Sequence, residues 1–160
     1  MALEIEKKYL TFSDKLPKLV GGILYIQGYL TLSPLIRFRV SGNEVCLNIK
    51  KIKSDSRIRD EWEFRSRLND DEIRELIGLS IKKPIEKVRY RTESHGLIWE
   101  IDVYQGENEG LITAEVELPG ENYAISFPEW IDNKHEISND ERFFNRNLGD
   151  FPYKLFRDSL

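Results

Sequence analysis

Several features that would assign this chain to a common class are missing from its sequence. A single cysteine, Cys46, excludes a disulfide within the chain, and no apolar run approaches the roughly 18 residues of a membrane-spanning helix. The first ten residues, MALEIEKKYL, carry two glutamates where a secretory signal peptide needs an apolar stretch. These absences predict a cytoplasmic protein with no membrane partner.

Net positive charge is also lacking. Lys and Arg number 24 against 28 Asp and Glu, which gives a formal net charge of −4, whereas nucleic-acid binding needs a net basic face. No linker rich in Pro, Gly or Ser and no internal repeat divides the 160 residues. We therefore predict one domain, 1–160, without a nucleic-acid partner.

What the sequence does contain is strand-period alternation. Turn residues such as Ser41-Gly42-Asn43 and Ser94-His95-Gly96 separate neighbouring segments and indicate antiparallel strands. The segments that alternate, or that are rich in β-branched and aromatic residues, are 4–10, 23–32, 36–41, 44–51, 60–68, 86–92, 97–105 and 111–118. The sequence therefore predicts about eight strands.

One clear helix interrupts these strands. Asn69 is a good N-cap with Glu72 three residues later, and an apolar stripe follows at Ile73, Leu76 and Ile77. This stripe predicts a helix that packs against the outside of the sheet. Shorter helices are predicted at 14–20, 121–127 and 140–148, the last ending at a glycine.

Charged residues occupy one face of nearly every predicted strand, because residues two apart share a face. Acidic pairs lie on the first, fifth, seventh and eighth strands, and basic residues lie on the third, fourth and sixth. For one strand alone, a solvated sheet face is the simpler interpretation. Segregation of the signs by strand favours an enclosed surface instead, since a solvated face would mix them.

Eight antiparallel strands can close into a barrel wide enough for a small ligand. Enclosed clusters of like charge are costly unless ions compensate them, so the acidic side calls for divalent cations and the basic side for a polyanion. Carboxylates without a His or Cys cluster suit Mg²⁺ or Mn²⁺. We predict a mainly β (α+β) fold, a closed eight-stranded antiparallel barrel, that holds metal and phosphate.

Motifs along the chain match this interpretation. Glu4-Ile5-Glu6-Lys7-Lys8 has the pattern ExExK, and Ile36-Arg37-Phe38-Arg39, Glu86-Lys87-Val88-Arg89 and Ala114-Glu115-Val116-Glu117 follow in order. This ordered set resembles the CYTH superfamily, the triphosphate tunnel metalloenzymes, and most of all its short bacterial inorganic tripolyphosphatases. The segment 128–145 is similar to their tail, in which a C-terminal helix closes against the tunnel, although Phe143 stands where relatives often carry Tyr.

The resemblance implies two divalent ions, Mg²⁺ or Mn²⁺, and hydrolysis of inorganic triphosphate to pyrophosphate and phosphate by a monomer or homodimer. The implied metal ligands are Glu4, Glu6, Glu61, Glu63, Asp102, Glu115 and Glu117. The implied catalytic residues are Glu4, Glu6, Lys8, Glu115 and Glu117. The implied substrate-binding residues are Lys8, Arg37, Arg39, Lys50, Lys87, Arg89 and Arg142.

Other functions within the superfamily stay open at this point. A class IV adenylyl cyclase, a thiamine triphosphatase or a nucleoside triphosphatase would need a pocket for its organic group, and the sequence does not identify one. A non-catalytic polyphosphate-binding module is a further alternative. The many acidic pairs argue against it, because binding alone does not need so many metal-liganding carboxylates.

Overall fold

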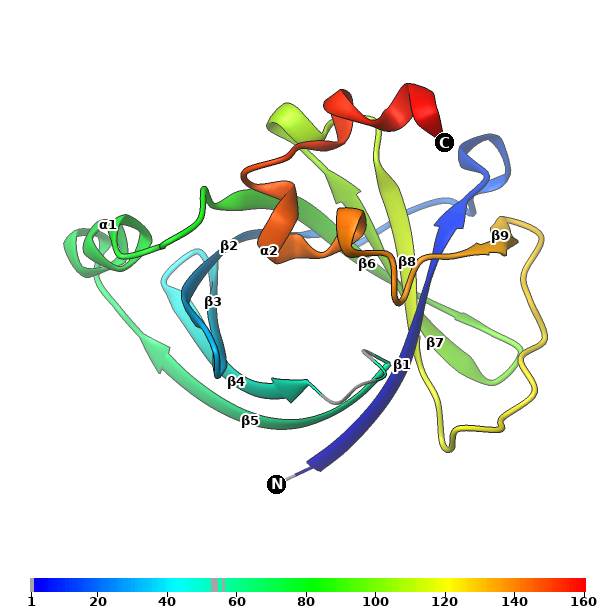
Figure 1. The fold of residues 1–160 in the computed structure, drawn as a ribbon, viewed down its shortest axis with the longest axis horizontal. Helices are drawn as coiled ribbons and strands as arrows, with labels where there is room; N and C mark the ends of the chain where they lie inside the picture. Colours follow the sequence, from blue (N-terminus) through cyan, green and yellow to red (C-terminus); the bar gives the residue numbers. More distant parts are fainter. Residues whose placement is uncertain (1, 53–54, 56) are drawn as a thin grey trace.

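The computed structural model describes residues 2–52, 55 and 57–160 and is built mainly from β-strands (Figure 1). The strands are β1 (Ala2–Thr11), β2 (Ile23–Leu32), β3 (Leu35–Ser41), β4 (Glu44–Ile52), β5 (Ile58–Arg67), β6 (Ile85–Ser94), β7 (Leu97–Tyr104), β8 (Ile112–Glu117) and β9 (Ile131–Glu136). The α-helices are α1 (Asp70–Gly78) and α2 (Asn145–Leu148), and the 3₁₀ turns are η1 (Ser13–Lys15), η2 (Gly106–Asn108), η3 (Glu141–Phe143), η4 (Tyr153–Leu155) and η5 (Arg157–Ser159).

The strands form one antiparallel sheet in the order β5-β4-β3-β2-β6-β7-β8-β1-β9. The long strand β1 has three partners along its length. Residues 6–10 pair with β8, residues 9–11 pair with β9, and residues 2–5 pair with β5, which stands at the far end of that order. Figure 1 shows the strands curving around a central space. The predicted mainly β class with antiparallel neighbours is confirmed, and all eight predicted strands are present.

Helix α1 lies against the outside of the sheet, as predicted. The Asn69 side chain accepts a hydrogen bond from the Glu72 amide and the Glu72 side chain accepts one from the Asn69 amide, which completes the predicted capping box. The helix places Ile73 and Ile77 against a buried cluster centred on Phe38 of β3. This packing covers the apolar face of β3 and β4, so the charged face of those strands points the other way.

The predicted helix at 121–127 is wrong. The structure has a turn at 121–122 and neither helix nor strand over 123–128, and Ile125 and Phe127, two residues apart, both pack against the buried cluster that contains Tyr9 and Trp99. Side chains two residues apart point to the same side in extended backbone, so packing against this cluster favours an extended segment over a helix. The same cluster buries Trp130.

The predicted helix at 14–20 is also wrong beyond its first turn. Only η1 forms, and Leu16 has the extended ψ of 143° that a following proline, Pro17, favours. The predicted helix at 140–148 is divided into η3 and α2 by Phe144, whose ψ of 130° is extended. The nine predicted residues therefore contain two short helical elements with one extended residue between them.

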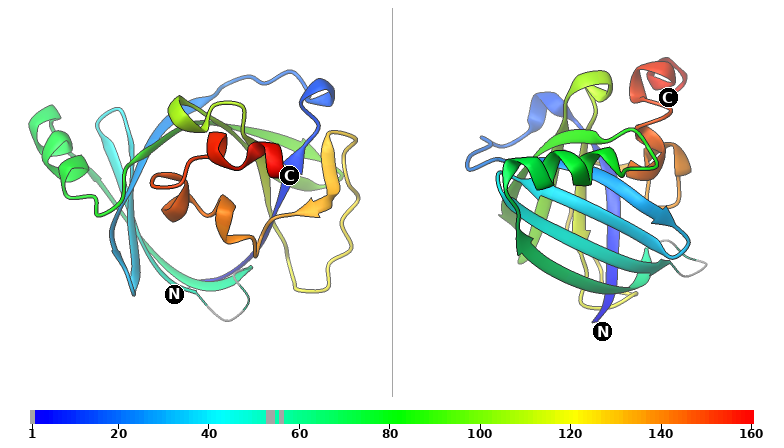
Figure 2. Two further views of the ribbon diagram at one scale, coloured as in Figure 1. Left: turned by 45° about the horizontal axis from the view of Figure 1, so that its top comes forward. Right: turned by 90° about the vertical axis from the view of Figure 1, so that its left-hand side faces the viewer.

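The C-terminal segment lies across one end of the curved sheet (Figure 2). Strand β9, which the sequence patterns did not predict, pairs with β1 and leads into η3 and α2. Figure 2 shows these orange and red segments in front of the central space. Within the described residues, no helix is both long enough and apolar enough to cross a membrane.

Candidate active site

The strand order collects the charges into two walls. The strands β7, β8, β1 and β5 are neighbours, and so are β4, β3, β2 and β6. We call the first set's cavity-facing carboxylates the acidic wall and the second set's cations the basic wall. The acidic wall consists of Glu4, Glu6, Glu61, Glu63, Glu100, Glu115 and Glu117, and the basic wall consists of Arg37, Arg39, Lys50, Arg89 and Arg91.

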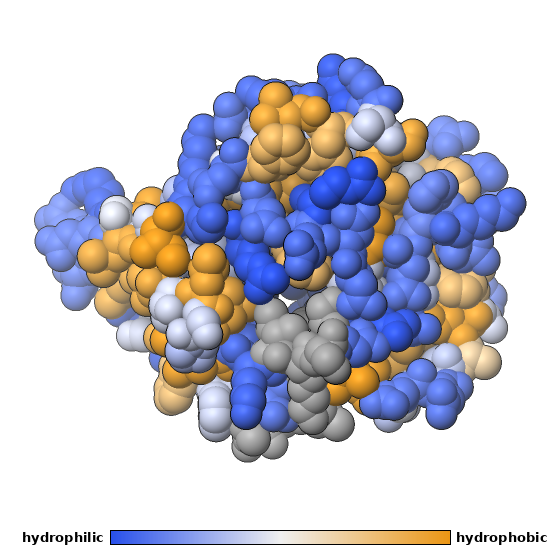
Figure 3. Space-filling view, viewed as in Figure 1, coloured by the Kyte–Doolittle hydropathy of each residue, from blue (hydrophilic) through white to orange (hydrophobic). Residues whose placement is uncertain are grey.

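Both walls line one cavity of about 350 Å³, the main cavity. Its remaining lining comes from Asn48 and Arg65, so every lining side chain is polar. Hydrophilic residues also gather around the centre of the face shown in Figure 3. The predicted site residues that the structure brings together here are Glu4, Glu6, Arg37, Arg39, Lys50, Glu61, Glu63, Arg89, Glu115 and Glu117.

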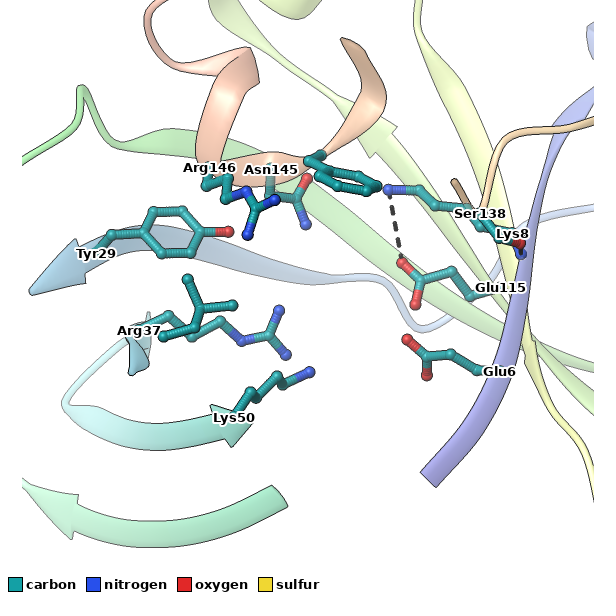
Figure 4. Close-up of a pocket in the computed structure, with 11 residues that line it drawn as sticks. Glu6, Lys8, Tyr29, Arg37, Lys50, Glu115, Ser138, Asn145 and Arg146 are labelled. Atoms are coloured by element: carbon teal, nitrogen blue, oxygen red, sulfur yellow. Dashed lines mark hydrogen bonds and ion pairs between the residues drawn. The ribbon is translucent and has the colours of Figure 1, made fainter. Parts of the chain in front are cut away.

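A second cavity of about 120 Å³, the cap cavity, adjoins the first beneath the C-terminal segment. The two cavities share Glu6 and Glu115 from the acidic wall and Arg37 and Lys50 from the basic wall. Figure 4 shows these two pairs facing each other across the space. The other lining residues of the cap cavity are Lys8, Tyr29, Leu35, Ser138, Phe144, Asn145 and Arg146.

Two arginines of the basic wall are arranged to receive an anion. The Nε atoms of Arg37 and Arg39 are buried, and neither has a hydrogen-bond partner in the part of the chain that the structure describes. Burial lowers the pKa of Arg39, and the positive charges of Arg37 and Arg89 lower it further. An anion between the walls would supply the missing partners and offset this repulsion.

Two lysines lie beside carboxylates of the acidic wall. The Lys50 ammonium, almost fully buried, lies 4.0 Å from Glu4 Oε2 and 3.8 Å from Glu61 Oε1. The Lys8 ammonium lies 3.8 Å from Glu115 Oε1 and donates to the Phe143 carbonyl oxygen at 3.2 Å. Both lysines are therefore held beside carboxylates and at the edge of the shared space.

Two predicted site residues lie behind the wall. Lys87 and Asp102 are completely buried, with Lys87 Nζ 2.8 Å from Asp102 Oδ2, and neither lines the main or the cap cavity. Arg89 binds both Asp102 oxygens at 2.7 and 2.8 Å. Although burial raises the pKa of the Asp102 carboxyl, Arg89 and Lys87 hold it down to about 2. Burial lowers the pKa of Lys87 to about 8.

A third predicted residue, Arg142, lies outside both cavities. Its guanidinium donates to both carboxylate oxygens of Asp140 and sits over the rings of Phe143 and Phe156. The break at Phe144 changes the direction of the chain, so α2 turns Arg146 toward the cavity in its place. Figure 4 shows Arg146 on the same side of the space as Tyr29 and Arg37.

Comparison with known proteins identifies the family to which this chain belongs. An inorganic triphosphatase of Acetivibrio thermocellus is 38% identical over 162 residues, covering 99% of this chain and 100% of the relative. The chain belongs to the inorganic triphosphatase family. An inorganic triphosphatase of Nitrosomonas europaea is 31% identical and covers 91% of this chain and 95% of its own length.

The fold of this family member agrees with that relationship. The crystal structure of the inorganic triphosphatase NE1496 matches it with a TM-score of 0.67 and 27% identity, over 93% of this chain and 95% of that one. No protein-family model matches the chain. The resemblance drawn from the sequence motifs to the short bacterial tripolyphosphatases is confirmed.

The acidic wall of this inorganic triphosphatase family member suits a divalent cation by its chemistry. It offers only carboxylate oxygens, the donors that Mg²⁺ and Mn²⁺ prefer. No three or more His, Cys, Asp or Glu side chains among the described residues are already grouped as a complete metal site. Mg²⁺ is commonly held by one or two carboxylates together with substrate phosphates. The carboxylates of the acidic wall therefore fit Mg²⁺ without forming a complete metal site by themselves.

Some residues of the cavities were missed by the sequence reasoning. Tyr29 lines the cap cavity, and it shares its strand face with the buried Gln27, whose amide donates to the Tyr29 hydroxyl at 2.9 Å. Strand parity could have identified Tyr29. Arg91 has the parity of Arg89 and could have been found in the same way. Asn145 lies in the segment 128–145 that resembles the family tail, but it was not assigned to the site, and Arg146 gave no signal, because nothing in the sequence marks the break at Phe144.

Proposed function

We propose that this chain hydrolyses inorganic triphosphate to pyrophosphate and phosphate with divalent metal ions, as one domain spanning 1–160. The observation that supports this most is the pair of opposed walls around the main cavity. An acidic wall alone would suit a cation and a basic wall alone an anion, whereas facing walls suit a metal-bound polyphosphate. The inorganic triphosphatase relatives agree with this choice.

We further propose that β1 to β8 form a closed tunnel around the substrate. The pairing of β1 with both β8 and β5 supports closure, since it joins the two ends of the eight-strand series. The C-terminal segment would then cover one mouth. Enclosure strengthens every charge interaction in the site, because water is excluded. The single buried cysteine is consistent with work in the cytoplasm.

The basic wall would hold the phosphates. Arg37 and Arg39 present planar guanidinium groups that suit phosphoryl oxygens, and Lys50 adds a point charge where the two cavities meet. Arg89, already bonded to Asp102 on one side, lies 3.8 Å from Glu115 and would neutralise charge at the boundary of the walls. Phosphoryl transfer depends mainly on such alignment and neutralisation.

The acidic wall would hold the metal ions. Glu4 and Glu6 of β1 and Glu115 and Glu117 of β8 are neighbours across paired strands, with Glu6 opposite Glu117. Glu61 and Glu63 lie on β5, which also pairs with β1, and would support the same set. A bound ion supplies charge neutralisation and a water of lowered pKa, so no protein nucleophile is required. Lys8, beside Glu115, would stabilise charge on the phosphate.

A phosphate-release assay tests this proposal and its alternatives together. Purified protein should release phosphate from inorganic triphosphate in Mg²⁺ or Mn²⁺, and more slowly from ATP and thiamine triphosphate. EDTA should stop the reaction, and Ca²⁺ should restore it poorly because its longer and looser coordination misplaces the water. Faster turnover of ATP, or cyclic AMP as a product, would replace the proposed substrate. Undiminished hydrolysis in EDTA would contradict the metal-dependent account.

Substrate binding by the basic wall can be tested without turnover. A ligand that binds the native state raises its melting temperature, so inorganic triphosphate with Ca²⁺ should stabilise the wild-type protein. Arg39→Ala should reduce that shift and raise KM about 10- to 100-fold, since it removes a charge-assisted contact of about 1.5 to 3 kcal/mol. Arg74→Ala, on the exposed surface of α1, is the matched control and should leave the shift unchanged. Equal shifts in both variants would remove Arg39 from the site.

A further inference from the structure

The shorter of the two α-helices among the described residues, α2, carries part of the cavity lining. α2 has only four residues, and two of them, Asn145 and Arg146, line the cap cavity opposite Lys8 and Glu115 (Figure 4). A helix this short has no stability of its own, because nucleation costs more than one turn of hydrogen bonds returns. The position of α2, and with it that of the Arg146 guanidinium, must therefore be set by contacts with the rest of the fold.

One such contact comes from the end of β7. The buried Tyr104 hydroxyl donates to Asn145 Oδ1 at 2.5 Å. The Tyr104 ring lies 5.6 Å from the buried Lys87 ammonium, and Tyr104 itself lines neither cavity. Tyr104 therefore reaches the cap cavity only through Asn145. Because Tyr104 is completely buried, this bond joins the first residue of α2 to the interior of the fold.

A second contact comes from the η2 turn. Asn108 is buried, its Nδ2 donates to the Leu148 carbonyl oxygen at 3.2 Å, and its Oδ1 accepts from the Tyr153 amide at 2.8 Å. One side chain thus satisfies the last residue of α2 and the chain that follows it. Ion pairs of Glu107 with Lys83 and Lys154 lie nearby but are exposed, so they contribute little.

We propose that Tyr104 and Asn108 are positioning residues for substrate binding, which fix α2 at its two ends so that Arg146 faces the phosphate site. This inference rests on the proposed triphosphatase function for its kinetic readout. Neither residue touches the cavity, so their effect on substrate passes through α2. The Lys8 bond to the Phe143 carbonyl oxygen adds a third support from the acidic side.

Tyr104→Phe removes only the hydroxyl that binds Asn145. We expect KM for inorganic triphosphate to rise about 3- to 10-fold, the equivalent of one neutral hydrogen bond, with kcat changed less than about twofold. In an Arg146→Ala background the same substitution should add little, because the residue whose position it controls is gone. Tyr123→Phe, on an exposed loop, is the matched control. Additive effects of Tyr104→Phe and Arg146→Ala would overturn the proposal.

Hydrogen exchange provides a readout that does not depend on the substrate. The amides of Asn147, Leu148 and Tyr153 are hydrogen-bonded in and after α2, and they should exchange faster in Tyr104→Phe and Asn108→Ala. Asn133→Ala, exposed on β9, should leave them unchanged. Unchanged exchange in both variants would overturn the positioning role. Faster exchange in a protein that does not hydrolyse inorganic triphosphate would retain that role for α2 and refute the proposed function instead.

Discussion

Replacing Glu6 by glutamine should reduce kcat for inorganic triphosphate at least 100-fold, more than the roughly 10- to 100-fold that loss of an outer-shell partner of a metal causes. Glu6 is one of two carboxylates that line both cavities, and it lies opposite Glu117 across the β1–β8 pairing. Glutamine keeps the side-chain volume but removes the charge that we assign to metal binding. Melting temperature in the absence of metal should stay the same or rise, because like charges in the acidic wall repel.

Two comparisons make this result specific. Glu129→Gln changes an exposed carboxylate and should retain full activity at every metal concentration. For Glu6→Gln, a titration with Mn²⁺ should restore little activity, since the lost ligand contributes to the arrangement of the ion as well as to its affinity. If Glu6→Gln instead reaches wild-type kcat at saturating Mn²⁺, Glu6 contributes to metal affinity alone and the acidic wall holds its ion elsewhere.

Strand parity predicted most of the main cavity from the sequence. Residues two apart on a strand share a face, so once Arg37 and Arg39 were placed inside, the neighbours of each were placed outside. The buried Phe38 confirms this, because it lies between the two arginines and packs under α1. The alternation of side chains between the two faces of a strand is a property of the backbone, so it can be predicted without knowing the tertiary structure.

Parity could not tell which inward charges reach the cavity. Lys87 and Arg89 share a face of β6, yet Arg89 lines the main cavity and Lys87 is buried against Asp102. The Tyr104 ring, 5.6 Å from the Lys87 ammonium, and the Asp102 carboxylate hold Lys87 away from the cavity. The position of the C-terminal segment depends on contacts such as those of Asn108, which are distant in sequence. Predictions on that segment, Arg142 among them, therefore differed most from the structure.

Lys87→Met should lower the stability of the fold far more than it changes substrate binding. Lys87 was expected from the resemblance to bind substrate, whereas the structure buries its ammonium 2.8 Å from Asp102 Oδ2. Methionine has a similar length and no charge, so the substitution leaves Asp102 buried with Arg89 alone. Removing one partner of a buried ion pair costs about 3 to 5 kcal/mol.

For a domain of this size that loss corresponds to a fall in melting temperature of about 6 to 20 °C, and differential scanning calorimetry without ligand measures it directly. Lys134→Met, on the exposed part of β9, is the control and should melt like the wild type. The folded fraction of Lys87→Met should bind inorganic triphosphate with nearly wild-type affinity, because Arg37, Arg39 and Lys50 are untouched. The opposite pattern, an unchanged melting temperature with a tenfold rise in KM, would mean that the Lys87 ammonium leaves Asp102 and reaches the phosphates, as the sequence motif alone implied.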